Sequence, residues 1–231
     1  MNNTRQTESV RLAARLVAVA LALAVAAIPF ALVLLRVLQH GRFAGLDSKV
    51  SRALSQLAFR STRTHALFEV VTHLGDKFVL AAIVLVIAGG LQLLRRRRES
   101  AFLLTTAVGG VLLAAVLKWL IAYARSVFVE PVADNLDKAF PSGHAMNSAF
   151  VYGALLIIAW PLLPPAPRWV VAIGTASLVT AIAASRVALG MHYISDVIIG
   201  GVAFGLAWLA AAVWAFARYR REAGETVTIS G

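Results

Sequence analysis

The sequence predicts an all-α protein, a polytopic membrane bundle of six transmembrane helices with an amphipathic helical segment between the first and the second. The 231 residues are 60% hydrophobic and only 14% charged, a balance too apolar for a soluble domain of this length. The apolar residues gather in runs, each near the ~20 residues needed to cross ~30 Å of hydrocarbon. Charged residues cluster between these runs. We therefore expect a single membrane-embedded domain over residues 1–231.

The six apolar runs place the expected spans at about residues 16–35, 78–94, 101–124, 145–163, 169–186 and 195–217. The first run follows a basic start, so a signal peptide is the alternative interpretation. We favour a retained helix because the run exceeds a signal core and lacks a clean cleavage context before Arg36. Prolines end the fourth run, since proline cannot continue a helix; they stand at Pro161, Pro164, Pro165 and Pro167.

Residues 36–77 form the longest polar segment and contain one helical apolar stripe. Its members share a face at helical spacing; they are Leu46, Val50, Ala53, Leu54 and Leu57. Flanking cations favour a helix in the headgroup region, and a helix that caps the bundle is the alternative. Asp76 follows Gly75 directly before the next run, where it is expected to cap the helix N-terminus.

The net charge of +11 indicates the kind of partner. In a soluble protein this charge would suggest nucleic acid. Here the cations stand beside apolar runs, so anionic lipid is the expected partner and nucleic acid is not. The sequence has no cysteine, which excludes disulfides and thiolate metal ligands.

The expected orientation places both termini in the cytoplasm. Lysine and arginine divide equally between the two faces of a six-span layout. The positive-inside rule weighs short loops most heavily, and Arg95–Arg98 closes a short loop on the side of the termini. The opposite, outer face then holds the end of the third run, the start of the fourth and the end of the fifth.

Lys118 and Arg125 stand at the outer end of the third span. Seven residues separate them, so they project from one helical face. A lysine after a long apolar run is costly unless it faces a polar cavity, which makes it a candidate functional group. Snorkelling of Lys118 to the interface is the alternative.

Pro141, Ser142, Gly143 and His144 stand where the fourth span begins. The free N–H groups of a helix start attract anions, and glycine lets phosphate approach the backbone closely. Ser142 adds a hydroxyl donor. A turn with an incidental histidine is the alternative.

Ser185, Arg186, His192 and Asp196 follow the fifth span. If the last helix begins near His192, the i,i+4 spacing lets the Asp196 carboxylate face the His192 ring. A carboxylate on one ring nitrogen fixes the tautomer and leaves the other nitrogen free to attack. Helix capping by the pair is the alternative.

Together these groups describe a phosphate site with a nucleophile and an acid. Zinc is the competing use of the two histidines, but it requires a third protein ligand. Clustered cations would also repel Zn²⁺ or Mg²⁺. We therefore expect chemistry without a metal or other cofactor.

The three motifs resemble the signature of the type 2 phosphatidic acid phosphatases, integral-membrane relatives of the vanadium haloperoxidases. The matching patterns are K-x6-R (Lys118 to Arg125), P-S-G-H (Pro141 to His144) and S-R-x5-H-x3-D (Ser185 to Asp196). Proline usually follows the first arginine of the family signature, whereas Ser126 stands here. Because that proline shapes the loop rather than the chemistry, the departure concerns loop geometry.

The resemblance implies a role for each motif residue. His192 attacks phosphorus and forms a phosphohistidine, and Asp196 orients it. His144 protonates the leaving oxygen and then activates water. The phosphate oxygens are held by cations and small donors that stabilise transition-state charge; these are Lys118, Arg125, Ser142, Gly143 and Arg186.

The expected function is hydrolysis of a lipid phosphate at the outer face of a bacterial-type inner (plasma) membrane. From topology and family analogy we favour undecaprenyl or a similar polyprenyl diphosphate as substrate, with the monophosphate as product. Phosphatidylglycerophosphate, phosphatidic acid and lipid A phosphates are alternatives. A binder or transporter of anionic lipid, which would need the cations but neither histidine, is the alternative from another class.

Overall fold

The computed structural model describes residues 44–128 and 140–222, with side chains at 49–121 and 140–219. Every regular element in these two ranges is helical. The helices are α2 (Ala44–Ala58), α3 (Thr62–His73), α4 (Lys77–Leu93), α5 (Arg97–Phe128), α6 (Gly143–Ala159), α7 (Pro165–Ala188), α8 (Ile194–Val197) and α9 (Phe204–Glu222). A 3₁₀ turn, η2 (Trp160–Leu162), follows α6, and a π-helical stretch, η3 (Ile198–Ala203), joins α8 to α9.

Four helical stretches are long and apolar enough to cross a membrane: Arg97–Ile121, Gly143–Leu162, Pro165–Ala188 and Ile194–Tyr219. A fifth crossing arises if α3 and α4 count as one span bent by 46° at Leu74–Asp76. The described residues therefore hold four or five spans, and the expected count of six is not confirmed. The expected first span, 16–35, lies outside the described residues.

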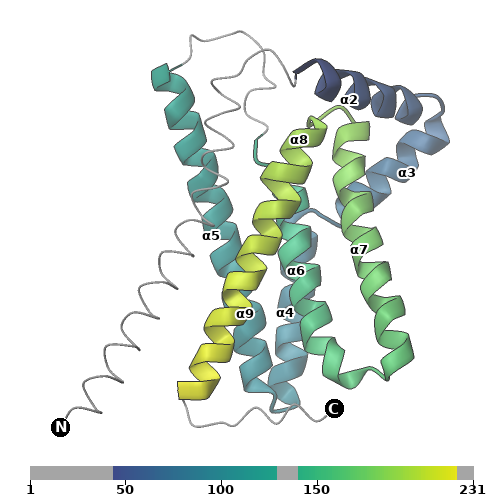
Figure 1. The fold of residues 1–231 in the computed structure, drawn as a ribbon. Helices are drawn as coiled ribbons and strands as arrows, with labels where there is room; N and C mark the ends of the chain where they lie inside the picture. The colour runs from purple at the N-terminus through teal and green to yellow at the C-terminus, as the bar shows by residue number, and fades with distance from the viewer. Residues whose placement is uncertain (1–43, 129–139, 223–231) are drawn as a thin grey trace. The chain divides into compact units, whose positions relative to one another are not determined.

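Helix α6 lies at the centre of the described bundle, where it packs against α4, α5, α7 and α9 (Figure 1). Its central position follows from its sequence, because small and apolar side chains surround the whole helix. Ala145, Ala149, Phe150 and Ala154 are all buried. A helix that is apolar all round belongs in the interior. The N-terminus of α6, which carries the P-S-G-H turn, is therefore surrounded by neighbouring helices.

Glycines let the last span approach α6 closely. A β-carbon on Gly201 would stand 3.3 Å from the Ser142 carbonyl oxygen, and one on Gly205 would stand 2.6 Å from the Met146 carbonyl oxygen. Small residues four apart permit this kind of backbone contact between membrane helices. The contact draws the α8–α9 region onto the first turn of α6.

Two glycines of α5, Gly109 and Gly110, make room for aromatic rings from neighbouring helices. The ring of Trp208 from α9 lies against Gly109, and the fully buried ring of Phe150 from α6 lies against Gly110. The indole N–H of Trp208 also donates to the Thr106 carbonyl oxygen at 2.8 Å. Helix α5 is thus packed against both neighbours at one level.

Helices α2 and α3 cover α7 at one end of the bundle (Figure 1). Ser51 and Ala58 of α2 are buried and Leu54 packs on the α7–α8 core, whereas Val50 and Leu57 of the predicted stripe are exposed. The buried face is therefore offset from the predicted stripe toward Ser51, whose Oγ accepts the Ile194 N–H of α8 at 3.3 Å. The structure fits a helix that caps the bundle and keeps part of its apolar face outside.

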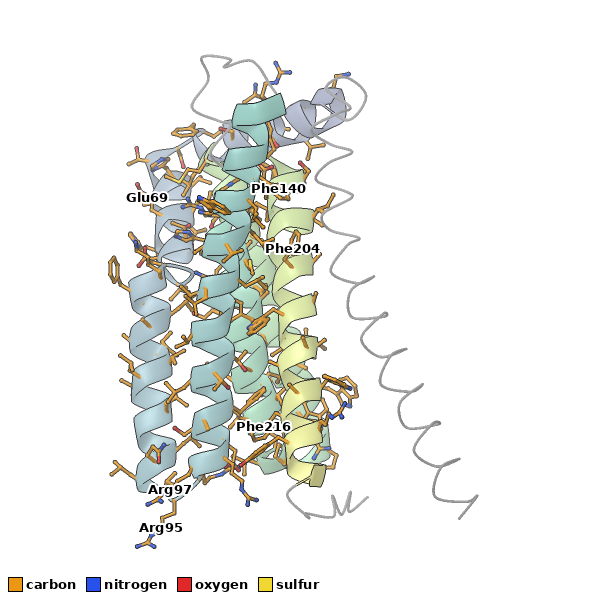
Figure 2. All side chains as sticks on the ribbon, turned by 90° about the vertical axis from the view of Figure 1, so that its left-hand side faces the viewer. Glu69, Arg95, Arg97, Phe140, Phe204 and Phe216 are labelled. Carbon is orange, nitrogen blue, oxygen red and sulfur yellow. The ribbon has the colours of Figure 1, made fainter. Side chains whose placement is uncertain are left out.

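The α3–α4 junction has the predicted helix cap. Asp76 has extended backbone geometry, and its Oδ1 accepts the Phe78 N–H at 2.8 Å. This confirms the predicted role of Asp76 as an N-cap. The other end of α4 leads to the arginine run, and Figure 2 shows Arg95 and Arg97 at the end of the bundle opposite Phe140.

Candidate active site

The P-S-G-H turn is buried at the start of α6. Pro141 and Ser142 are buried, and the Ser142 N–H donates to the Asp196 carbonyl oxygen at 3.3 Å. The Ser142 carbonyl accepts the Met146 N–H at 3.0 Å, while its Oγ has no hydrogen-bond partner among the described residues. A buried hydroxyl without a partner is costly. Ser142 therefore presents a donor that a bound oxyanion could use.

Lys118 reaches this turn from α5. Its Nζ lies 3.7 Å from the position that a β-carbon on Gly143 would occupy. The ammonium group thus stands beside the first residue of α6, where helix N–H groups are free of intrahelical partners. A cation and a helix N-terminus at one point form an anion-binding site.

Arg186 approaches from the last turn of α7. Its Nη1 donates to Thr72 Oγ1 at 3.3 Å, while its buried Nε has no partner in the described part of the chain. Asp76 interacts with the guanidinium group electrostatically. The remaining donors of the guanidinium are thus held in the site, where they can bind a phosphate oxygen.

His144 lies in the first turn of α6, with its ring against Gly75. A β-carbon on Gly75 would be 3.4 Å from both Cβ and Cδ2 of His144. The groups that act electrostatically on the ring come from α7, the α3–α4 junction, α5 and α3; they are Arg186, Asp76, Lys118 and His73. Glycine at 75 therefore permits a close fit between the α3–α4 junction and the ring.

His192 is 9% exposed and lies between α7 and α8. Burial, followed by the positive charges of Arg186 and Lys118 and by His144, lowers the pKa of His192 to about 4. The ring is therefore neutral at pH 7 and keeps a lone pair for attack. Its Nδ1 is buried and has no hydrogen-bond partner among the described residues.

Asp196 is buried in α8, where its Oδ2 accepts the backbone N–H of Tyr193 at 3.0 Å. The helix begins at Ile194, after His192, so the predicted i,i+4 helical spacing does not apply to the His192–Asp196 pair. The carboxylate instead caps the helix beside His192. Its carbonyl oxygen accepts from Ser142, so Asp196 joins the two motifs.

The structure thus brings five of the eight predicted site residues around one point: Lys118, Gly143, His144, Arg186 and His192. Ser142 and Asp196 are joined to each other by a backbone hydrogen bond, next in the chain to Gly143 and four residues after His192. The side chain of Arg125 lies outside the described side chains, although its backbone belongs to α5. The sequence interpretation missed Thr72, and it read Asp76 only as a cap. Thr72 carries no motif, so no signal in the sequence could have linked it to Arg186.

Two cations, a helix N-terminus and a neutral buried histidine come together in a protein with membrane-length helices, an arrangement suited to binding a phosphate group. The PAP2 superfamily model matches residues 100–221. This match covers more than half of the chain, which therefore belongs to the PAP2 superfamily. The resemblance seen in the three motifs is confirmed.

Two known proteins are similar to this chain. Phosphatidylglycerophosphatase B of Bacillus subtilis (strain 168) is 29% identical over 181 residues, which cover 77% of this chain and 86% of the relative. The crystal structure of a transmembrane PAP2-type phosphatidylglycerolphosphate phosphatase from Bacillus subtilis aligns with a TM-score of 0.70 at 25% identity. The alignment covers 87% of this chain and 98% of that one. The chain is a PAP2-type membrane lipid phosphatase, a phosphoric monoester hydrolase that acts on lipid phosphates.

Proposed function

We propose that this enzyme hydrolyses the phosphate monoester of phosphatidylglycerophosphate, or of a closely similar lipid, through a phosphohistidine. The observation that carries the proposal is the convergence of Lys118, Arg186 and His144 on His192. The substrate choice rests on the two similar proteins, both of which are named for phosphatidylglycerophosphate. They favour this lipid over the undecaprenyl diphosphate expected from topology.

The first chemical step breaks the ester bond. A ring nitrogen of His192 attacks phosphorus, and Nε2 is the available atom because Nδ1 is buried. The bond from phosphorus to the glycerol oxygen breaks as that oxygen takes a proton from His144. His144 enters this step protonated, and the bound phosphate dianion balances its charge. Asp196 acts through the backbone, because it holds the Tyr193 N–H next to His192.

The second step releases phosphate. Water attacks the phosphohistidine while His144, now neutral, takes its proton. The phosphorus–nitrogen bond breaks and inorganic phosphate leaves, which restores both histidines. In both steps the negative oxygens are held by preformed donors, and such donors stabilise the transition state strongly; in this chain they are Lys118, Arg125, Ser142, Gly143 and Arg186.

A substrate panel tests the proposal. Purified protein in detergent with EDTA is given phosphatidylglycerophosphate, phosphatidic acid, lipid A and undecaprenyl diphosphate. We expect the highest kcat/KM for phosphatidylglycerophosphate and no phosphate release by H192A. No release from any of these lipids, or undiminished release by H192A, would reject the proposed mechanism. A preference for undecaprenyl diphosphate would instead reject the substrate assignment alone.

We further propose that the site faces the outside and the termini the cytoplasm. Support comes from the arginine run, since Arg95 and Arg97 lie at the end of the bundle opposite Phe140 (Figure 2), and short basic loops stay inside. The absence of cysteine makes labelling simple. Glu69→Cys should react with an impermeant maleimide on intact cells, whereas Gln92→Cys should react only after lysis. The reverse pattern would invert the orientation.

A further inference from the structure

The α3–α4 junction Leu74–Asp76, here called the elbow, lies outside the family-matched residues 100–221 but contacts the site. The Leu74 carbonyl accepts the Tyr152 hydroxyl of α6 at 2.8 Å. The Gly75 backbone lies against the His144 ring. Thr72, two residues before the elbow, accepts a hydrogen bond from Arg186. The elbow region is therefore anchored to α6 and α7, two of the three helices that carry phosphate-site residues.

The elbow lies on one side of the site. Asp76 and His73 act electrostatically on His144. The groups that act on His192 are Arg186, Lys118 and His144. The contact between Gly75 and the His144 ring places the elbow beside His144, and the Asp76 carboxylate acts electrostatically on His144 and on Arg186.

The proposed mechanism indicates which part of the substrate lies beside the elbow. In phosphoryl transfer the attacking atom and the leaving oxygen are roughly in line on opposite sides of phosphorus. If His192 attacks and His144 protonates the leaving oxygen, the rest of the leaving group lies beyond His144. The elbow borders this region, and its Asp76 carboxylate is the negative charge among the groups that act electrostatically on His144.

We propose that the elbow borders the leaving group of the substrate. Its Asp76 carboxylate selects an uncharged alcohol over a second phosphate as that leaving group. The inference rests on the roles of His192 and His144 in the proposed function. A carboxylate repels a phosphate leaving group, because like charges raise each other's energy in a partly desolvated site. A glycerol hydroxyl carries no charge and can accept or donate a hydrogen bond. Asp76 thereby favours phosphate monoesters over diphosphates.

The test compares two substrates with the same lipid anchor, phosphatidic acid and diacylglycerol diphosphate. Attack on phosphorus expels an alcohol from the first and phosphatidate from the second. The measured quantity is the ratio of kcat/KM for the diphosphate to kcat/KM for the monoester. Asp76→Asn removes the charge and retains the helix cap, since Asn caps as well as Asp. We expect the ratio to rise about tenfold in D76N.

Glu69→Gln is the matched control. Glu69 is a carboxylate on the preceding helix, where it pairs with His65 at 3.7 Å. Its neutralisation changes net charge as D76N does, but it should leave the ratio unchanged. A second capping substitution, Asp76→Ser, repeats the measurement independently of the amide.

Each outcome decides between the hypotheses. An unchanged ratio in D76N and D76S overturns the inference while leaving the proposed function intact. Loss of both activities in both variants also overturns it, because Asp76 would then serve the reaction or the fold rather than the choice of leaving group. If the unmodified enzyme and E69Q release no phosphate from either lipid, or if H192A stays active, the proposed function itself fails.

Discussion

Ser142 donates its backbone N–H to the carbonyl oxygen of Asp196 at 3.3 Å. This bond ties the turn that begins α6 to the helix that follows His192. Asp196 also caps that helix through the Tyr193 N–H. The turn at Ser142 and the segment that carries His192, the proposed nucleophile, are therefore parts of one hydrogen-bonded unit. Substitutions in either should disturb both.

The division of labour between the histidines can be separated with p-nitrophenyl phosphate, whose leaving group needs no proton. H192A should form no phosphoenzyme and release no phosphate. H144N should still form the phosphohistidine but hydrolyse it about 10²–10⁴-fold more slowly, because it lacks the base for water. Rapid quench with ³²P-labelled substrate measures both species. Equal loss of the phosphoenzyme in the two variants would contradict the assignment.

The pH dependence follows from the charge around His192. Its pKa lies at about 4, below the usual value near 6.5; the ring is thus neutral above pH 4 and becomes protonated as pH falls through that value. The nucleophile should be lost in the same range. Lys118→Met removes one of the cations that lower the pKa, so the midpoint should rise. Histidine ¹³C NMR in detergent measures the titration midpoint of His192, with H192Q to assign its signal. A lower midpoint in K118M would show that the Lys118 charge does not lower the pKa of His192.

Thr72 should act as a positioning residue for Arg186. Thr72→Val keeps the shape but removes the oxygen that accepts from Nη1. A hydrogen bond to a charged group contributes about 1.5–3 kcal/mol; at 3.3 Å we expect the low end, a loss of about tenfold in kcat/KM carried mainly by KM. Thr72→Ser should restore activity. A Ser variant as impaired as Val would indicate a packing role instead.

The close contact between α9 and α6 predicts opposite effects of two alanines. Gly205→Ala places a β-carbon 2.6 Å from the Met146 carbonyl oxygen, which cannot move freely, so it should cost about 1–3 kcal/mol. At Gly174 in α7 a β-carbon meets nothing within 4 Å. Gly174→Ala should leave stability unchanged or raise it by up to about 1 kcal/mol. Thermal midpoints in detergent compare them, and equal midpoints would argue against the packing explanation.

Much of the fold could be predicted because hydrocarbon thickness dictates run length and proline ends helices. The run expected at 145–163 appears as Gly143–Leu162, and α7 begins at Pro165. The break between α3 and α4 could be predicted from Gly75 and Asp76, but the 46° bend there could not. Its angle depends on tertiary contacts, in particular the Tyr152–Leu74 hydrogen bond.

The candidate site was predictable where residues carry chemistry in a motif and unpredictable where they act by position. Histidines and cations beside apolar runs are costly, which draws attention to Lys118 and His192. Thr72 and Gly75 have ordinary side chains, and their relation to Arg186 and His144 exists only after the helices pack. The start of α8 was also misplaced by the i,i+4 argument, because Tyr193 rather than His192 precedes the helix.

The two aromatic rings that pack against α5 fix the position of Lys118, which lies about two turns further along that helix. Trp208 and Phe150 occupy the sites at Gly109 and Gly110, so α5 cannot slide past either neighbour without displacing a ring. A slip by one turn would move the ammonium group by about 5.4 Å, out of reach of Gly143. The glycine pair thus sets the register of α5, and the contacts with Trp208 and Phe150 determine the level in the bundle at which the Lys118 ammonium group lies.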